Sequence, residues 1–142
     1  MGDAPQEEEE NAAEGRFPSA FDQASALSNG EASAMLSKIV DKKKADDPAY
    51  QPNPLLAKTL EYAERFSGNK TEAVNQQVRQ VLEAGGLTTF EVASVANLQP
   101  ETAEEAKILI PTLEAEDGGM PRFTDESLQE LLDDVAKYKG EI

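Results

Sequence analysis

Apolar residues recur at intervals of three and four along most of this chain, which is the spacing of one face of an α-helix. The first such stripe predicts a helix from Ser28 or Asn29 to about Lys43. Its apolar face consists of Met35, Leu36, Ile39 and Val40. A second helix should open at Asn53–Pro54, as cap and first position, and continue to Phe66, because proline is favoured at the first turn.

Two further helices are predicted in the middle of the chain. The third runs from about Thr71 to Ala84 and ends at Gly85–Gly86, since glycine readily adopts the left-handed conformation that stops a helix. Its narrow apolar stripe consists of Val74, Val78, Val81 and Leu82. The fourth begins at Thr88, whose hydroxyl forms a capping box with the Glu91 carboxylate, and ends near Asn97.

The stretch 98–113 predicts a short, strongly bounded fifth helix from about Ala103 to Ile110. Pro100 and Thr102 mark its start, Glu105 stands where a capping box needs a carboxylate, and Pro111 prevents continuation. Three residues should turn inward: Ala106, Leu109 and Ile110. A sixth helix should follow Thr124 and run to about Lys139. One side of it carries Leu128, Leu131, Leu132, Val135 and Tyr138.

No segment alternates polar and apolar residues for long enough to predict a strand. Six helices with short connections predict an all-α bundle over residues 28–142, preceded by an N-terminal arm, residues 1–27. Residues 1–15 are too acidic and polar to bury much surface, so we expect this part of the arm to be disordered. Phe17, Phe21 and Leu27 then stand on the arm as isolated apolar side chains. They either dock on a partner or fold back onto the chain's own core.

Composition excludes several classes of function. The chain has 142 residues, 13 basic and 28 acidic, for a net charge of −15. A surface this acidic is solvated and repels phosphate backbones, which disfavours autonomous nucleic-acid binding. The chain has neither cysteine nor histidine, so Ser-His, Cys-His and His-metal sites are excluded. No apolar run approaches the roughly 20 residues of a membrane span, and we expect a soluble intracellular protein.

The remaining clusters favour structural interpretations over chemistry. The acidic clusters at 104–105, 114–117 and 133–134 lack the spacing of a calcium loop, and solvated charge explains them. Residues 125–128 resemble an acyl-carrier motif, but Glu126 interrupts the required order. We expect the basic run 42–44 to complement the helix dipole rather than to form a nucleic-acid-binding patch. Tyr62 and Phe66 could stack on a nucleobase, although their spacing favours packing inside the protein.

Beyond these local signals, the 98–113 string L-Q-P-E-T-A-E-E-A-K-I-L-I-P-T-L resembles the signature of the fourth-subunit family of eukaryotic RNA polymerase II. The resemblance extends over residues 28–138. It is carried also by 58–67 (K-T-L-E-Y-A-E-R-F-S), by the approach 90–98 and by the closing helix 123–135. Residues 116–122 look like an insertion, the turn after Phe66 looks shortened, and the tail 139–142 lacks the family's ending.

The resemblance implies a helicase-and-RNase-D C-terminal (HRDC)-like helical fold and a non-catalytic subunit of RNA polymerase II without a cofactor. Members of the family pair with the seventh subunit as the stalk near the RNA exit path, where the partner contacts RNA. The implied location is the nucleus, with cytoplasmic shuttling left open. No membrane or small-molecule substrate is implied. The residues expected to bind the partner are Phe17, Phe21, Leu27, Leu36, Ile39 and Val40.

Two alternatives remain open at this stage. HRDC-type folds also occur as nucleic-acid-binding modules appended to helicases, and such a module needs a basic face. The chain could also be the equivalent stalk subunit of another polymerase, archaeal or of the third nuclear type. The long acidic arm and the strength of the signature favour polymerase II.

Overall fold

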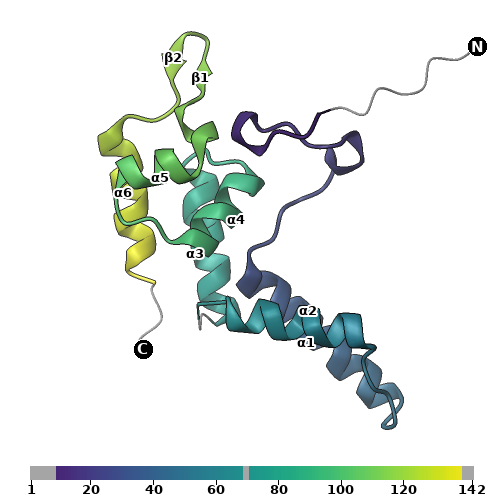
Figure 1. The fold of residues 1–142 in the computed structure, drawn as a ribbon. Helices are drawn as coiled ribbons and strands as arrows, with labels where there is room; N and C mark the ends of the chain where they lie inside the picture. Colours follow the sequence, from purple (N-terminus) through teal and green to yellow (C-terminus); the bar gives the residue numbers. More distant parts are fainter. Residues whose placement is uncertain (1–8, 69–70, 139–142) are drawn as a thin grey trace, which may run out of the picture.

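The computed structural model describes residues 9–68 and 71–138, and this part of the chain folds into α-helices joined by short connections (Figure 1). The helices are α1 (Asn29–Asp46), α2 (Pro54–Arg65), α3 (Glu72–Ala84), α4 (Thr89–Leu98), α5 (Ala103–Leu109) and α6 (Asp125–Ala136). The all-α prediction is confirmed, and each predicted helix is present at its expected place. Lys139, the predicted end of the sixth, lies outside the described residues. The HRDC-like label is compatible with the fold.

Local side-chain chemistry begins each helix. Six residues accept a hydrogen bond from the backbone N–H three positions on: Ser28, Asn53, Thr71, Thr88, Thr102 and Thr124. The capping box predicted at Thr88 and Glu91 is confirmed. The box predicted at Glu105 is wrong in its partner, because that carboxylate accepts from the N–H of Glu101 at 3.0 Å. The Glu105 carboxylate still lies in the first turn of α5, at the positive end of the helix dipole.

The hydrophobic core lies among α3 to α6, which we call the body. Leu82, Leu113 and Leu128 are fully buried in it, and the predicted inner side of α6 packs here. Among the described residues, this core cluster takes none from α1 or α2. These two helices instead pack on each other and project from the body as an antiparallel pair (Figure 1). The pair must therefore be held to the body by contacts outside the main core.

Helix α5 differs from its prediction at one residue. Ala106 and Ile110 are buried as expected, but Leu109 is 45% exposed. The helix is short, and its inward stripe is formed by Ala103, Ala106 and Ile110. Leu109 lies about 90° from the centre of that stripe, so it cannot turn inward with it. After Pro111 the chain continues as the 3₁₀ turn η3 (Pro111–Glu114), which buries Leu113.

The segment after η3 contains a small hairpin that periodicity did not predict. Strands β1 (Glu116–Asp117) and β2 (Met120–Pro121) pair antiparallel, with Asp117 opposite Met120. Gly118 and Gly119 join them with φ of +61° and +82°. Two residues with positive φ form the tight turn that suits a two-residue hairpin loop. Each strand has two residues and is too short to show an alternating pattern, which is why periodicity did not predict it.

A buried ion pair joins three parts of the body. Glu91 on α4 is 1% exposed, and its carboxylate accepts hydrogen bonds from Arg122 at 2.8 and 3.0 Å and from the Thr112 hydroxyl at 2.7 Å. Burial by itself would raise the pKa of the Glu91 carboxyl, but the Arg122 hydrogen bonds reverse this and hold it below its ordinary value. The same pair raises the pKa of Arg122. The pairing therefore favours the charged form of both groups, although Glu91 is buried and Arg122 is only partly so.

No helix in the described ranges is long and apolar enough to cross a membrane.

Candidate partner interface

Large apolar side chains lie exposed on the α1–α2 pair. We call this set the hairpin face, and its members are between 42% and 77% exposed: Met35, Ile39, Leu55, Tyr62 and Phe66. The rings of Tyr62 and Phe66 lie 4.7 Å apart. The prediction that these two aromatics pack inside is wrong, because α2 turns a different side toward α1. Large apolar side chains of both helices are exposed as a result.

Helical geometry explains why both helices expose apolar residues on the same side. Leu36 and Val40 on α1 are half-buried and buried, and on α2 Ala63 is buried while Leu56 and Leu60 are half-buried. These residues mark the faces that the two helices turn inward. In each helix the exposed apolar residues lie about 80–130° round from the centre of that inner face, in the same rotational sense. Because the helices are antiparallel, the two flanks face the same way.

The described part of the arm lies against the body. The Phe17 ring lies 4.9 Å from the Phe90 ring on α4 in a tilted arrangement, and Phe17 is half-buried. Phe21 and Leu27 are 59% and 41% exposed. Between the arm and the body lies a groove of about 930 Å³, lined by residues that include Phe17, Phe21, Phe90 and Thr112. Of the possibilities left open by the sequence, Phe17 folds back onto the chain itself.

The six residues predicted to bind a partner thus have different surroundings. Phe21, Leu27 and Ile39 are exposed, Phe17 and Leu36 are half-buried, and Val40 is 5% exposed. Arm and α1 do not form one flat surface in this structure. Periodicity did not predict that Met35 is exposed on α1, nor that Leu55, Tyr62 and Phe66 are exposed on α2. The available signal was that α2 carries more apolar residues than a single buried stripe can use.

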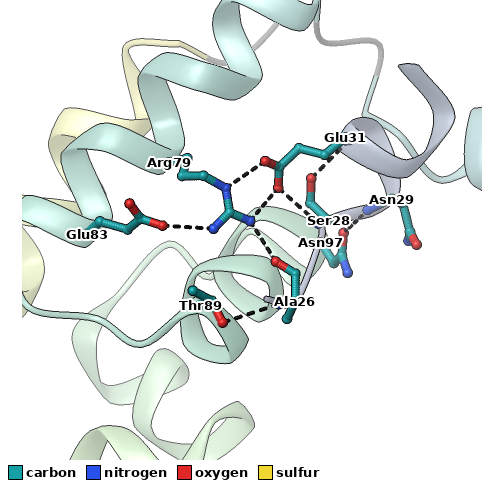
Figure 2. Close-up of polar contacts among 8 residues, drawn as sticks. All are labelled: Ala26, Ser28, Asn29, Glu31, Arg79, Glu83, Thr89 and Asn97. Carbon is teal, nitrogen blue, oxygen red and sulfur yellow. Dashed lines mark hydrogen bonds and ion pairs between the residues drawn. The ribbon is translucent and has the colours of Figure 1, made fainter. Parts of the chain in front are cut away.

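An arginine on α3 contacts both the end of the arm and the start of α1, and so holds them to the body (Figure 2). The Nε and Nη2 atoms of Arg79 donate to both carboxylate oxygens of Glu31 at 2.6 and 2.7 Å. The same Nη2 donates to the Ala26 carbonyl at 2.8 Å, and Nη1 donates to Glu83 at 2.9 Å. We call these four residues the Arg79 cluster. It links residues 26–31, where the arm meets α1, to α3, which lies 48 residues further along the chain.

Two further hydrogen bonds support the same junction. The Ala26 N–H donates to the Thr89 hydroxyl at 3.2 Å, and the Asn29 N–H donates to the Asn97 side-chain oxygen at 2.8 Å (Figure 2). Glu31 also caps α1, accepting from the Ser28 N–H at 3.0 Å. The last residues of the arm and the first turn of α1 are therefore bonded to both α3 and α4.

The electrostatics of the cluster favour its charged state. Burial alone would raise the pKa of the Glu31 carboxyl, but hydrogen bonds from Arg79 and the Ser28 backbone lower it below its ordinary value. The Glu31 contact in turn raises the pKa of Arg79. The Arg79 and Glu31 side chains are each 17% exposed, so solvent screens this pair less than an open surface pair.

Charge is unevenly distributed along the chain. Residues 29–66, which contain the α1–α2 pair, carry six Lys and Arg against six Asp and Glu, while the whole chain has a net charge of −15. All of the excess negative charge therefore lies outside this pair. The 42–44 lysine run is exposed at the end of α1, where Lys43 lies 5.4 Å from the Tyr50 ring centre. Within residues 9–68 and 71–138, no three acidic side chains lie close enough together to hold a metal ion.

Comparison with known protein families assigns most of this sequence to one family. The family model described as RNA polymerase Rpb4 matches residues 26–139, which begins at Ala26 of the Arg79 cluster and includes all six helices. This chain belongs to the RNA polymerase Rpb4 family. The resemblance drawn from the 98–113 signature is thereby confirmed.

Individual relatives agree with this assignment. The chain is 36% identical over 135 residues to "DNA-directed RNA polymerase II subunit 4" of Arabidopsis thaliana, covering 94% of this chain and 96% of that protein. It is 32% identical over 148 residues to "DNA-directed RNA polymerase II subunit rpb4" of Dictyostelium discoideum, covering 94% and 91%. Over 87 residues it is 33% identical to the Saccharomyces cerevisiae protein "DNA-directed RNA polymerase II subunit RPB4", covering 61% and 37%. Rpb4-family membership makes this chain an accessory polymerase subunit rather than a catalytic one.

Proposed function

We propose that this Rpb4-family chain pairs with the seventh subunit of RNA polymerase II to form the stalk, and that it does so through its arm and its α1–α2 pair. The stalk then attaches to the core polymerase in the nucleus, where it supports initiation and the handling of transcript and factors near the RNA exit path. RNA is contacted through the partner rather than by this acidic chain.

The observation that carries this proposal is the hairpin face. Its five large apolar side chains lie on helices that contribute nothing to the main core cluster of the described residues. Exposed apolar patches of this kind mark interaction sites in soluble proteins. The five side chains of the hairpin face are themselves uncharged, which supports a polypeptide partner, because the centre of a protein interface is depleted in charge.

The arm supplies the second part of the proposed interface. Phe21 and Leu27 remain exposed when Phe17 rests on Phe90, so they are available to a partner seated beside the arm. Leu36 and Val40 support the hairpin face from behind, where α1 meets α2. Ile39 is the expected anchor on α1.

Co-expression with the seventh subunit tests the proposal. An Ile39→Asp, Tyr62→Asp double variant should fail to co-purify with the partner at high salt, because two charges would be buried at the interface. Both positions are exposed, so the variant chain should itself stay folded by circular dichroism. The matched control is Ile108→Asp, on α5 and 70% exposed, which should pair normally. Retention of the partner by the double variant would overturn the proposal.

A nucleic-acid-binding role is the second candidate, and one observation favours it. Tyr62 and Phe66 are exposed, and the Arg65 guanidinium lies 6.0 Å from the Phe66 ring centre, so a base could stack here. The acidic remainder of the chain opposes this role. Titrating RNA against the isolated chain decides the matter, since submicromolar binding with a steep salt dependence would favour the nucleic-acid module.

A further inference from the structure

The orientation of the α1–α2 pair needs an explanation, because the main core does not include it. Polar contacts between α1 and α3 help to hold the pair to the body. Glu31 pairs with Arg79, and Lys38 pairs with Glu72 at 2.5 Å on an exposed surface. On α3, the buried Asn75 stands between Glu72 and Arg79, and its side-chain atoms would be 2.9–3.3 Å from any Cβ at Gly30. The pair therefore meets the body along a narrow line of contact.

We propose that Arg79 is a positioning residue for the partner interface: it holds the root of the arm and the first turn of α1 to the body together, and so presents the hairpin face in one orientation. This inference rests on the proposed function for its consequence in binding. Arg79 is not part of the hairpin face and acts on the partner only through the segments that it holds.

The shape of the arginine side chain suits this role. A guanidinium donates in a fixed planar fork, so a two-point contact with one carboxylate restricts rotation as well as distance. Here the fork engages both oxygens of Glu31, and the Nη2 atom also reaches the Ala26 carbonyl (Figure 2). Losing Arg79 would therefore loosen α1 and the arm root at once, and would leave the Ala26–Thr89 and Asn29–Asn97 hydrogen bonds to hold the junction to α4. A lysine could replace the charge but not the fork.

Binding should depend on this orientation even though Arg79 stays away from the partner. When only a fraction of molecules has the binding-competent arrangement, the apparent affinity falls by that fraction. If Arg79→Gln leaves about one molecule in ten correctly oriented, affinity for the partner falls about tenfold. Most of that loss should appear in the association rate, because the interface contacts themselves are intact once formed.

Distance measurement by electron paramagnetic resonance tests the orientation directly in the full chain. The sequence contains no cysteine, so spin labels attach only at introduced positions. Lys44→Cys on α1 and Glu130→Cys on α6, both exposed, report the separation of the pair from the body. The parent should give one narrow distance distribution, and Arg79→Gln should broaden it while helix content by circular dichroism stays unchanged.

Two variants separate positioning from general stability. Glu83→Gln removes the charge of a neighbouring partner of Arg79 but leaves Glu31 and Ala26 in place, so it should keep the narrow distribution and parental binding. Glu31→Gln can still cap α1, because glutamine serves in a capping box, yet it loses the charged pair with Arg79. It should broaden the distribution without melting the helix, and it serves as the decisive variant if Arg79→Gln does not fold.

A narrow distribution in both Arg79→Gln and Glu31→Gln would overturn the proposal. So would a broadened distribution with an association rate equal to that of Glu83→Gln, since orientation would then have no effect on pairing. Failure of the unsubstituted chain to bind the seventh subunit would instead refute the proposed function. The distance measurement would still decide whether Arg79 orients the pair.

Discussion

Arg122 donates hydrogen bonds to both carboxylate oxygens of the buried Glu91, from a position 31 residues further along the chain. The same guanidinium also reaches the Gly86 and Thr112 carbonyls, each at 3.1 Å. One side chain thus connects α4 with the segments before α4 and after α5. The interaction holds α4 and these two segments of the body together.

Removal of Arg122 should leave the Glu91 charge buried without its partner. We expect Arg122→Gln to lower the free energy of unfolding by about 3 kcal/mol in urea denaturation, the usual loss when one member of a buried pair is removed. Lys137→Gln is the control, because its pair with Asp134 is exposed and should contribute less than about 1 kcal/mol. Equal losses in the two variants would show that the Glu91 pair is not buried as described.

Acid should destabilise the protein through Glu91 and Glu31. Both carboxyls have a lower pKa in the folded chain than their ordinary value of 4.5, so their stabilisation is complete above that value. It is lost as the pH falls through the lower pKa of the folded state. The thermal midpoint should therefore decline more gently with acid in Glu91→Gln, which starts from a lower midpoint. Parallel curves for this variant and the parent would contradict the expectation.

Truncation of the exposed aromatic Phe66 should leave the fold intact. Phe66→Ala removes the ring contact with Tyr62, one turn earlier in the chain. Such a pair is worth roughly 0.2–0.5 kcal/mol, so the urea midpoint should hardly change. Binding of the seventh subunit should weaken by about 2 kcal/mol, as for an anchor at an interface centre. Calorimetry of both reactions makes the comparison, with Ile108→Ala as the control. A stability loss as large as that of the core variant Leu82→Ala would place Phe66 inside the protein.

The contact between Phe17 and Phe90 should protect the arm from proteolysis. An aromatic pair of this kind contributes about 0.5–1.5 kcal/mol, so Phe90→Ala should speed tryptic cleavage after Arg16 by up to about tenfold. Phe21→Ala should not change the rate, because Phe21 is largely exposed. Mass spectrometry of the early fragments measures both. An unchanged rate in Phe90→Ala would mean that the ring contact does not hold the arm.

Because α1 approaches α3 closely at position 30, any side chain there should lower the free energy of unfolding. A Cβ there would lie 2.9 Å from Nδ2 of Asn75, a buried atom that has no hydrogen-bond partner in the described part of the chain. Gly30→Ala should therefore cost about 1–2 kcal/mol in denaturant unfolding despite alanine's better helix propensity. The same change in an Asn75→Ala background should cost far less. Equal costs in the two backgrounds would locate the strain elsewhere.

Helix boundaries were determined by the sequence itself because capping is local chemistry. The Thr88 hydroxyl needs only the N–H of Glu91, Asn53 needs that of Leu56, and Gly86 adopts its φ of +97° without help from distant residues. The signature 98–113 likewise identified the family from contiguous residues. The prediction failed where the relevant partner is remote or the element is very short. The capping partner of Glu105 and the hairpin at 116–121 are examples.

Only the tertiary structure decided which of several apolar flanks is buried and which charges meet. Leu109 and Phe66 are exposed because another side of their helices fills the available contact, and periodicity alone does not choose between adjacent flanks of a helix. Arg79 and Glu31 are 48 residues apart, and nothing local pairs them. Their meeting depends on the crossing of α1 over α3 at Gly30, where packing of whole helices sets the distance between residues that the sequence keeps far apart.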